Sequence, residues 1–288
     1  MRKLTKIFAI VLTIALVCTL AACGTAASGT TQAAGSTSGK PVLRVAMECG
    51  YAPYNWTQPT DENGAVQIAD SKDYAYGYDV MMAKTLAEKI GYDVQIVKLD
   101  WDSLIPALQS GTVDCVIAGQ SITSERLEMV DFTTPYYYAS IVGLTLKGSA
   151  YENAKGVADL ANATCTSQLG TVWYDVCLPQ IEGADILAAQ ESAPAMLVAL
   201  ESGRVNLVVT DQPTALAASV AYPDMVMLDF ADGEDNFKVS EEEINIGISV
   251  KKGNKELLDK LNGALATLTT DDFTSMMEEA ISVQPLSN

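Results

Sequence analysis

The sequence predicts an α/β fold in two lobes, each a mainly parallel sheet flanked by helices. Three observations lead to this prediction. Short β-rich runs alternate with segments of helical periodicity from Val42 onward, an order that favours parallel strands covered by helices on both faces. The same alternation starts again near Ile141. Residues 41–288 are numerous enough for two lobes of ordinary size.

The first unit is expected to run strand, helix, strand, helix, strand. Apolar residues recur at helical spacing between 78 and 90, and Gly91 ends that helix. Asp102 is the expected N-cap of the second helix, which Gly111 ends. The expected elements are a strand at 42–46, a helix at 78–90, a strand at 94–97, a helix between 102 and 111 and a buried strand at 113–118.

The second unit repeats the alternation and implies a cleft between the two. Ligands in such folds bind outside the carboxyl ends of the strands. Two extended crossings, near 136–140 and 244–249, would join the lobes as a hinge. The expected elements are strands at 141–146, 163–166, 207–209 and 244–250, and helices at 172–182, from the Ser192 cap to Gly203, and at 213–221, 255–268 and 271–282.

The N-terminal segment has the features of a secretory signal. Arg2, Lys3 and Lys6 precede an apolar run at 7–20. That run is shorter than the roughly 20 residues of a membrane span and suits a signal peptide. Residues 24–40 are almost entirely Gly, Ala, Ser, Thr and Gln, a composition typical of a flexible tether.

The tetrapeptide Leu20-Ala21-Ala22-Cys23 resembles the bacterial lipoprotein signal. By that resemblance residues 1–22 are removed, and Cys23 becomes a lipidated N-terminus at the start of a tether, 23–40. The alternative is an ordinary cleaved signal that happens to contain a cysteine. No later apolar run approaches membrane-spanning length. The expected location is therefore the outer face of the bacterial cytoplasmic membrane, with a lipid anchor as the only membrane contact.

Composition excludes several classes of function. The chain has 18 basic and 36 acidic residues, a net charge of −18, so nucleic acid is not an expected partner. A cationic ligand is one interpretation of this charge, and a solubilising surface is the preferred one. Histidine is absent, which excludes Ser-His and Cys-His catalysis and His-containing metal sites, and no metal or cofactor is expected. Four cysteines could form disulfides or remain buried thiols, and none has CxxC spacing: Cys49, Cys115, Cys165 and Cys177.

Six segments occur in an order and spacing that are specific only when taken together. They are Tyr51-Ala-Pro-Tyr54, Gly77-Tyr-Asp-Val80, WDSLIPAL at 101–108, AGQSITSER at 118–126, DFTTPY at 131–136 and TDQP at 210–213. From Leu43 to Ala280 the chain thereby resembles the family 3 extracellular solute-binding proteins. These include lysine/arginine/ornithine-, glutamine- and cystine-binding proteins of bacterial importers. The resemblance implies a two-lobed periplasmic-binding-protein-like fold and an amino-acid receptor of an ABC importer, not an enzyme.

A site for a free amino acid needs a fixed cation, a fixed anion and a shaped wall. By the resemblance, Arg126 supplies the cation, whose guanidinium grips a carboxylate through two parallel bonds. Ser121 and the Gly119 backbone add neutral donors. The alternative for Arg126 is a surface arginine paired with a neighbouring glutamate. Asp211 follows a buried strand and supplies the anion for the ligand ammonium, and it can cap the next helix at the same time.

The walls of the site are also implied by the resemblance. Gly170 and Thr171 resemble a Gly-Thr turn that presents backbone donors to the ligand carboxylate, although apolar residues follow here where the family usually has a small polar one. Tyr51 and Trp101 occupy positions where the family stacks aromatic rings around the ligand side chain. Ring faces hold methylene groups and attract cations. Taken without the resemblance, both aromatic residues would be expected in the core.

Glu48 bears on the identity of the ligand. It lies three residues before Tyr51, where receptors for basic amino acids carry an acid, and glutamine and cystine receptors can also carry one. Gln120 adds a polar group nearby, and the segment 57–75, longer than the family's usual hairpin, is expected at the cleft mouth. Lysine or arginine ranks first, with glutamine or cystine next. The rival from another class is a cyclic-acid dehydratase, for which Glu48 is the one evident acid or base. The absent histidine and the full set of amino-acid anchors argue against it.

The expected mechanism is hinged closure. Lobe 1 is expected at 41–137 and 246–288, and lobe 2 at 138–245. Because carboxylate and aromatic contacts come mainly from lobe 1 and the Asp211 contact from lobe 2, a ligand would favour the closed state. The expected partners are a free amino acid and an ABC permease, and the protein is expected to be a monomer.

Overall fold

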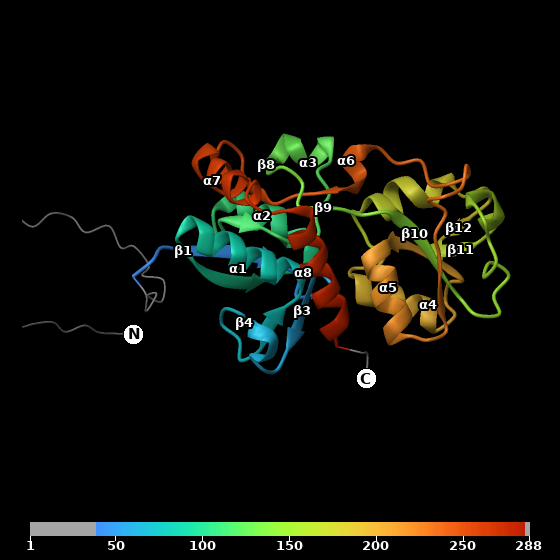
Figure 1. The fold of residues 1–288 in the computed structure, drawn as a ribbon. Helices are drawn as coiled ribbons and strands as arrows, with labels where there is room; N and C mark the ends of the chain where they lie inside the picture. The colour runs from blue at the N-terminus through green and yellow to red at the C-terminus, as the bar shows by residue number, and fades with distance from the viewer. Residues whose placement is uncertain (1–38, 286–288) are drawn as a thin grey trace, which may run out of the picture. The chain divides into compact units, whose positions relative to one another are not determined.

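The computed structural model describes residues 39–285 (Figure 1). The signal peptide, the Cys23 anchor and nearly all of the tether lie outside these residues. Within 39–285 no helix combines the length and the apolar character needed to cross a membrane. Two five-stranded sheets, each with flanking helices, form the two lobes, and a small four-stranded sheet accompanies the first.

The first lobe is built on a sheet with the strand order β6-β1-β7-β16-β8. Strand β1 runs parallel to β6 and β7, and β16 runs antiparallel to β7 and β8. The register places Val42 opposite Asp93 and Met47 opposite Lys98. The strands are β1 (Val42–Met47), β6 (Asp93–Lys98), β7 (Cys115–Val116), β8 (Val130–Phe132) and β16 (Ser249–Lys251).

Helices and a small sheet complete the first lobe. Helix α1 ends at Gly91, which adopts the left-handed conformation expected of a C-cap glycine, and it contacts β6, α7 and α8. The expected Asp102 cap is wrong, because a 3-10 turn at Trp101–Ser103 precedes α2, which begins without a side-chain cap. The remaining elements are α1 (Tyr78–Ile90), α2 (Leu104–Ser110), α3 (Ser124–Met129), α7 (Lys255–Leu265), α8 (Thr270–Val283), and the small sheet of β2 (Gly50–Tyr51), β3 (Asn55–Gln58), β5 (Tyr74–Tyr76) and β4 (Val66–Gln67).

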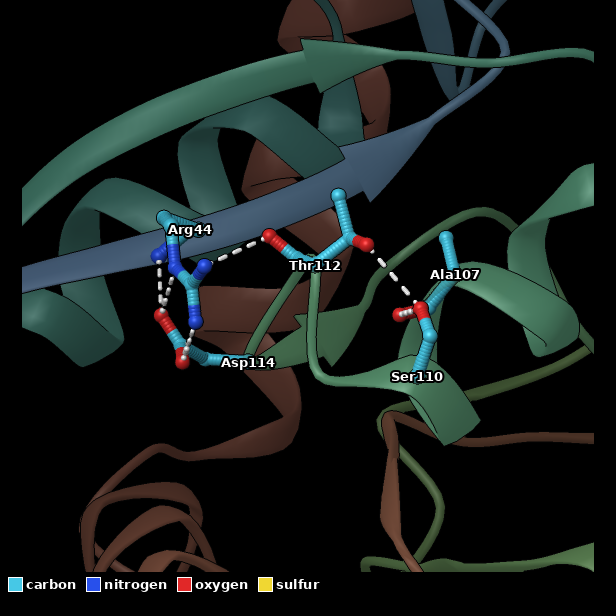
Figure 2. Close-up of polar contacts among 5 residues, drawn as sticks. All are labelled: Arg44, Ala107, Ser110, Thr112 and Asp114. Carbon is cyan, nitrogen blue, oxygen red and sulfur yellow. Dashed lines mark hydrogen bonds and ion pairs between the residues drawn. The ribbon is translucent and has the colours of Figure 1, made fainter. Parts of the chain in front are cut away.

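A bidentate ion pair connects β1 to the chain just before β7. The Arg44 guanidinium donates to both oxygens of Asp114 at 3.0 and 2.7 Å and to the Thr112 carbonyl at 2.7 Å (Figure 2). Ser110 at the end of α2 donates to the Ala107 carbonyl at 2.9 Å. Two parallel N–H···O bonds fix direction as well as distance. These contacts hold the α2–β7 turn against β1, and so help to position the residues that follow β7.

The second lobe is built on a sheet with the strand order β12-β11-β13-β10-β14. Strand β11 is parallel to β12 and β13, whereas β10 is antiparallel to β13 and β14. Both lobes therefore have mixed sheets instead of mainly parallel ones, because the strands that follow the two crossings, β10 and β16, run against their neighbours. The strands are β10 (Ile141–Leu146), β11 (Thr164–Thr166), β12 (Asp185–Ile186), β13 (Leu207–Asp211) and β14 (Met225–Leu228).

The helices of the second lobe follow the expected caps, with two corrections. Ser192 and Asp211 cap α4 (Ala193–Glu201) and α5 (Gln212–Ala221) through their side chains. The segment expected as a helix at 172–182 is a π-turn at Trp173–Cys177 followed by a 3-10 turn at Leu178–Gln180, because Pro179 interrupts regular α-helical bonding. The segment expected as one strand at 244–250 is divided between α6 (Glu241–Ile244), β15 (Asn245–Ile246) and β16.

The two crossings between the lobes are paired. Strand β9 (Tyr137–Tyr138) runs antiparallel to β15, with Tyr138 opposite Asn245 and Tyr137 opposite Ile246. This short ladder joins the segments that were expected to act as the hinge. The residue limits proposed for the lobes remain a prediction.

The four cysteines of the described residues are buried free thiols. Burial raises the pKa of Cys49 and Cys177 to about 12 and that of Cys165 to about 11, and it raises the pKa of Cys115 further. The thiol interpretation therefore holds over the disulfide one. Thiols with raised pKa values are poor nucleophiles.

Candidate ligand-binding site

The residues expected to bind the ligand gather where the strands of the two sheets end. Strand β1 leads directly into Glu48, and β13 ends at Asp211. One cavity is lined by six expected residues, Tyr51, Trp101, Gly119, Ser121, Arg126 and Thr171, together with Gln168, Val172 and Trp173. The other three expected residues, Glu48, Gly170 and Asp211, each form a hydrogen bond with one of these lining residues.

Arg126 lies on α3, where Thr123 caps the helix by accepting from the Arg126 amide at 3.3 Å. Its guanidinium donates to the Ser121 carbonyl at 2.9 Å and to the Gly170 carbonyl at 3.0 Å. The guanidinium carbon lies 5.3 Å from the centre of the Trp101 ring, a cation–π distance. Burial lowers the pKa of Arg126 to about 10, so the group stays charged at neutral pH. Among residues 39–285 no ion pair joins Arg126 to a glutamate, so the alternative of an arginine paired with a neighbouring glutamate is not supported.

Asp211 has two hydrogen-bonding functions at the end of β13. One oxygen accepts from the Thr214 amide at 2.8 Å and thereby caps α5. The other accepts from the Tyr51 hydroxyl, which reaches it from the first lobe. Only 1% of Asp211 is exposed. Burial raises its pKa above the ordinary value, and the hydrogen bonds from Tyr51 and Thr214 offset part of that rise.

The Tyr51 ring forms part of an aromatic wall. It stacks on Tyr54 with centroids 4.7 Å apart and faces Trp173 at 6.1 Å. Gly119 has a φ of +61°, and a Cβ on it would lie 2.6 Å from the Tyr51 ring. A glycine is therefore required there on both steric and conformational grounds. The Gly119 amide, expected to donate to a ligand, instead donates to the Tyr136 hydroxyl at 3.2 Å.

Glu48 is a buried carboxyl with one unpaired oxygen. Gln168 donates to its Oε1 at 3.2 Å, and its Oε2 is buried with no partner among the described residues. Burial raises the pKa of Glu48 to about 7, with the Gln168 hydrogen bond opposing the rise. An unpaired buried acceptor is uncommon and requires an explanation. A donor arriving in the cavity would supply one.

The remaining expected residues present few free groups. The Ser121 hydroxyl donates to the Glu243 carbonyl at 3.2 Å, and the Thr171 hydroxyl donates to the Gln168 carbonyl at 2.7 Å. Gln120 accepts from Ser249 at 3.1 Å through its Oε1. The cavity itself has a volume of about 20 Å³, which is room for roughly one water molecule.

Known proteins place this geometry in a family. Residues 43–280 match the profile of the bacterial extracellular solute-binding proteins, family 3. The chain belongs to this family. The match spans both sheets and every residue expected at the site.

Three relatives of this solute-binding protein differ in the ligand that they are named for. The chain is 29% identical to a probable histidine-binding protein of Campylobacter jejuni over 80% of its length and 81% of the relative's. It is 27% identical to the L-cystine-binding protein TcyJ of Escherichia coli K12, with 82% and 81% covered. A Streptococcus pneumoniae amino-acid ABC transporter substrate-binding protein bound to L-arginine superposes with a TM-score of 0.72 and 26% identity, over 84% and 94% of the two chains.

A larger pocket of about 610 Å³ adjoins the small cavity in this solute-binding protein. The two share four lining residues, Trp101, Arg126, Thr171 and Val172. Carboxylates from both lobes border the larger pocket, among them Asp102 on the first and Asp175 on the second. The segment 57–75 was expected at this mouth, but none of its residues lines either space; it forms part of the small sheet instead.

The sequence did not identify Gln168 and Tyr54 as parts of the site. It drew notice to Trp173 only as a departure from the residues that usually follow the family's Gly-Thr turn. Gln168 follows β11 at its carboxyl end, the same kind of position that identified Asp211, and this signal could have found it. Tyr54 was quoted as part of a motif, but its stacking on Tyr51 depends on the turn between β2 and β3. Trp173 closes the wall opposite Tyr51.

Proposed function

We propose that this chain is the extracytoplasmic substrate-binding component of an amino-acid ABC importer. It captures a polar or basic amino acid, with arginine or lysine first, by hinged closure and delivers it to a membrane permease. The observation that carries the proposal is the presence of opposite charges at one aromatic cavity. Arg126 of the first lobe lines the cavity, and Asp211 of the second lobe accepts a hydrogen bond from Tyr51, which also lines it. The family and the named ligands of its relatives support it.

Each charged group has a proposed task. Arg126 binds the ligand carboxylate, Asp211 binds the ammonium, and the unpaired oxygen of Glu48 binds the distal polar group of the side chain. Because the cavity has a volume of only about 20 Å³, entry requires the lobes to part and the Tyr51 hydroxyl to leave Asp211. The ligand ammonium then takes the place of that hydroxyl, which makes closure dependent on the ligand.

The placement of the protein completes the proposal. Cys23 carries the lipid that holds a monomer on the outer face of the cytoplasmic membrane. The permease recognises the closed, loaded form. Glutamine or cystine is the alternative ligand, because Glu48 accepts hydrogen bonds from neutral donors as well as from cations.

A thermal-shift screen of the purified protein against the twenty amino acids, ornithine and cystine tests the ligand class. A ligand present at about 100 times its Kd stabilises the folded state by about 2.7 kcal/mol. Arg126→Ala should weaken binding by roughly 2–5 kcal/mol, since it leaves the ligand carboxylate without its partner. Arg204→Ala, which removes an exposed arginine of the second lobe, is the matched control and should change nothing. No shift with any of these compounds would reject the amino-acid assignment.

One observation favours an enzyme as the second candidate. The pKa of Glu48 near 7 suits a general acid or base at neutral pH. Incubation with prephenate, the substrate class of the related dehydratases, tests this candidate. Turnover that disappears in Glu48→Gln would establish an enzyme, and an unchanged substrate with a normal amino-acid shift would leave the receptor as the function.

A further inference from the structure

A separate pocket of about 320 Å³ lies beside the chain neighbours of Tyr51. Gly50 and Ala52, the neighbours of Tyr51 in the chain, line it on one side, and α4 and α5 of the second lobe line it on the other. Gln284 and Pro285, which follow α8, line it as well. The pocket shares no lining residue with either space around Arg126.

The chemistry of the lining is apolar with few donors. Trp56 is 4% exposed, and Leu197 and the alanines of α5 face it across the pocket. Burial keeps the Cys49 thiol neutral by raising its pKa to about 12. Asp and Glu are absent from the described residues that line the pocket, although the whole chain contains 36 acidic residues. Lys98 is the one charged group among them.

Gln284 is a lining residue with an unpaired hydrogen-bond donor. Only 7% of this residue is exposed, and its Nε2 is buried without a partner among the described residues. Buried amide donors are nearly always paired in folded proteins. Lys98 adds a cation whose Nζ donates to Thr57 at 3.1 Å and has two further hydrogens to give.

We propose that this pocket is a second binding site, which takes a small organic acid with an apolar body and a single carboxylate. The apolar body lies between Trp56 and α4–α5, and the carboxylate accepts from both Lys98 and Gln284. A zwitterionic amino acid is excluded as the occupant, because the described lining holds no anion for its ammonium. Because both lobes supply walls, an occupant favours the arrangement in which they meet.

Calorimetric titration of the purified protein with hexanoate tests the proposal. Hexan-1-ol and hexylamine are probes of equal length without the negative charge, and hexanoate should bind at least about tenfold more tightly than either. The alcohol can make only neutral hydrogen bonds, which are weaker than charged ones, and the ammonium of hexylamine is repelled by Lys98. Lys98→Met and Gln284→Leu should each weaken hexanoate about tenfold, and Leu197→Trp, which fills the pocket, should abolish binding. Lys72→Met, an exposed lysine of the same lobe, is the control and should bind as the wild type does.

The results distinguish this site from the amino-acid site. Arg126→Ala should keep hexanoate binding while it loses the amino acid, so the two proposals can fail separately. Hexanoate binding that is lost in Arg126→Ala, or that equals hexan-1-ol binding, would overturn the second site. A Kd of about 1 mM is the weak limit of specific recognition. If hexanoate at that concentration gives no heat of binding, the second site is overturned as well. If Leu197→Trp fails to fold by circular dichroism, the exposed substitution Lys98→Met decides the question.

Discussion

Glu48 is held in surroundings that favour its neutral form. Burial raises its pKa from 4.5 to about 7, and the nearby carboxylates of Asp100 and Asp102 add to that rise. Asp79 is buried as well, but the Tyr136 hydroxyl and the Asn55 amide donate to its two oxygens at 2.6 and 2.8 Å. Burial raises the pKa of Asp79 to about 6, and these two hydrogen bonds oppose the rise. The two carboxyls differ in their partners, because Asp79 has a donor for each oxygen and Glu48 has a donor for one.

Glu48→Gln should therefore stabilise the protein in a pH-dependent manner. A carboxyl whose pKa is higher in the folded state than in the unfolded state contributes stability that is complete below pH 4.5 and lost as pH rises through about 7. Above pH 7 the free energy of unfolding of the variant should exceed that of the wild type by up to ~3 kcal/mol, which raises its melting temperature. Near pH 4 this gain should vanish. Melting curves at both pH values check this. An equal gain for the exposed Glu88→Gln control would contradict the burial argument.

Gly119→Ala should disturb the site through its backbone. An alanine there must keep a φ of +61°, and its Cβ meets the Tyr51 ring at 2.6 Å. The expected loss of stability is about 1–3 kcal/mol, with weaker amino-acid binding because Tyr51 moves. Gly263→Ala is the control, since Gly263 lies in α7 with open space where a Cβ would go. It should gain about 0.5–1 kcal/mol. Denaturant titration measures both stability changes. If Gly119→Ala leaves the stability unchanged, the Tyr51 ring can move aside without cost.

The sequence was sufficient to predict where a residue lies when its position depends only on the local direction of the chain. Asp211 and Tyr51 follow short strands, so their positions at a sheet edge could be expected, and the structure brings them into contact. Their ligand roles remain predictions. The Gln168–Glu48 hydrogen bond could not be predicted, because it joins residues 120 positions apart in sequence across the two lobes. The hydrogen bond from the Gly119 amide to the Tyr136 hydroxyl could not be predicted either, because it also joins residues that are not local in sequence.

Among the elements, the sequence predicted two of the three expected side-chain caps correctly, but it did not predict the irregular turns. Ser192 and Asp211 cap α4 and α5 as expected, because capping depends on residues three positions apart. The π-turn at 173–177 precedes Pro179, which interrupts regular α-helical bonding. The segment at 244–250 is divided because its two parts pair with different strands, β15 with β9 and β16 with β7 and β8. At Gly247 a Cβ would lie 2.7 Å from the Ile122 side chain, so the chain packs there in a manner that apolar periodicity does not record.

The cap on α5 offers a way to separate the two roles proposed for Asp211. Asparagine caps helices about as well as aspartate, so Asp211→Asn should keep the α5 cap and lose less stability than the about 1 kcal/mol that removal of a cap costs. The same change removes the charge that is proposed to bind the ligand ammonium, and amino-acid affinity should fall at least about 100-fold. Thermal melting and calorimetry together measure this separation.

Ser192→Ala provides the opposite case on α4. It removes the hydroxyl that accepts from the Ala195 amide at 3.4 Å, at a cost of about 1 kcal/mol, and should leave affinity unchanged. If Asp211→Asn keeps full affinity, the carboxylate is only a helix cap. If Ser192→Ala lowers affinity as much as Asp211→Asn does, loss of affinity reflects loss of stability and not a missing ligand contact.

At the scale of the whole molecule, three of the hydrogen bonds between the lobes involve groups that the proposed ligand would engage. Tyr51 donates to Asp211, Gln168 donates to Glu48, and Arg126 donates to the Gly170 carbonyl. Ser121 and Ser124 of the first lobe also donate to the second, to the Glu243 carbonyl and the Glu242 carboxylate. Lobe contact and ligand binding therefore draw on the same side chains, and a change in one must alter the other.

Tyr51→Phe isolates that coupling. The variant keeps the ring that stacks on Tyr54 but leaves the second oxygen of Asp211 buried without a donor when the lobes meet. A stranded buried acceptor costs about 1–3 kcal/mol, enough to move the closed population roughly 5- to 150-fold. Without ligand the variant should therefore open, and arginine should close it again because its ammonium donates to the same oxygen.

Pulsed electron paramagnetic resonance measures the lobe separation between two spin labels. They are attached at Lys89→Cys and Lys147→Cys, exposed positions on the first and second lobes. The buried native thiols have raised pKa values and should react slowly with the label, which a sample lacking the two new cysteines verifies. Distances that lengthen in Tyr51→Phe and shorten with arginine support the shared use of Asp211. If the distances equal those of the wild type with and without arginine, the Tyr51–Asp211 contact does not hold the lobes together, and closure must be assigned to Arg126 and Gln168.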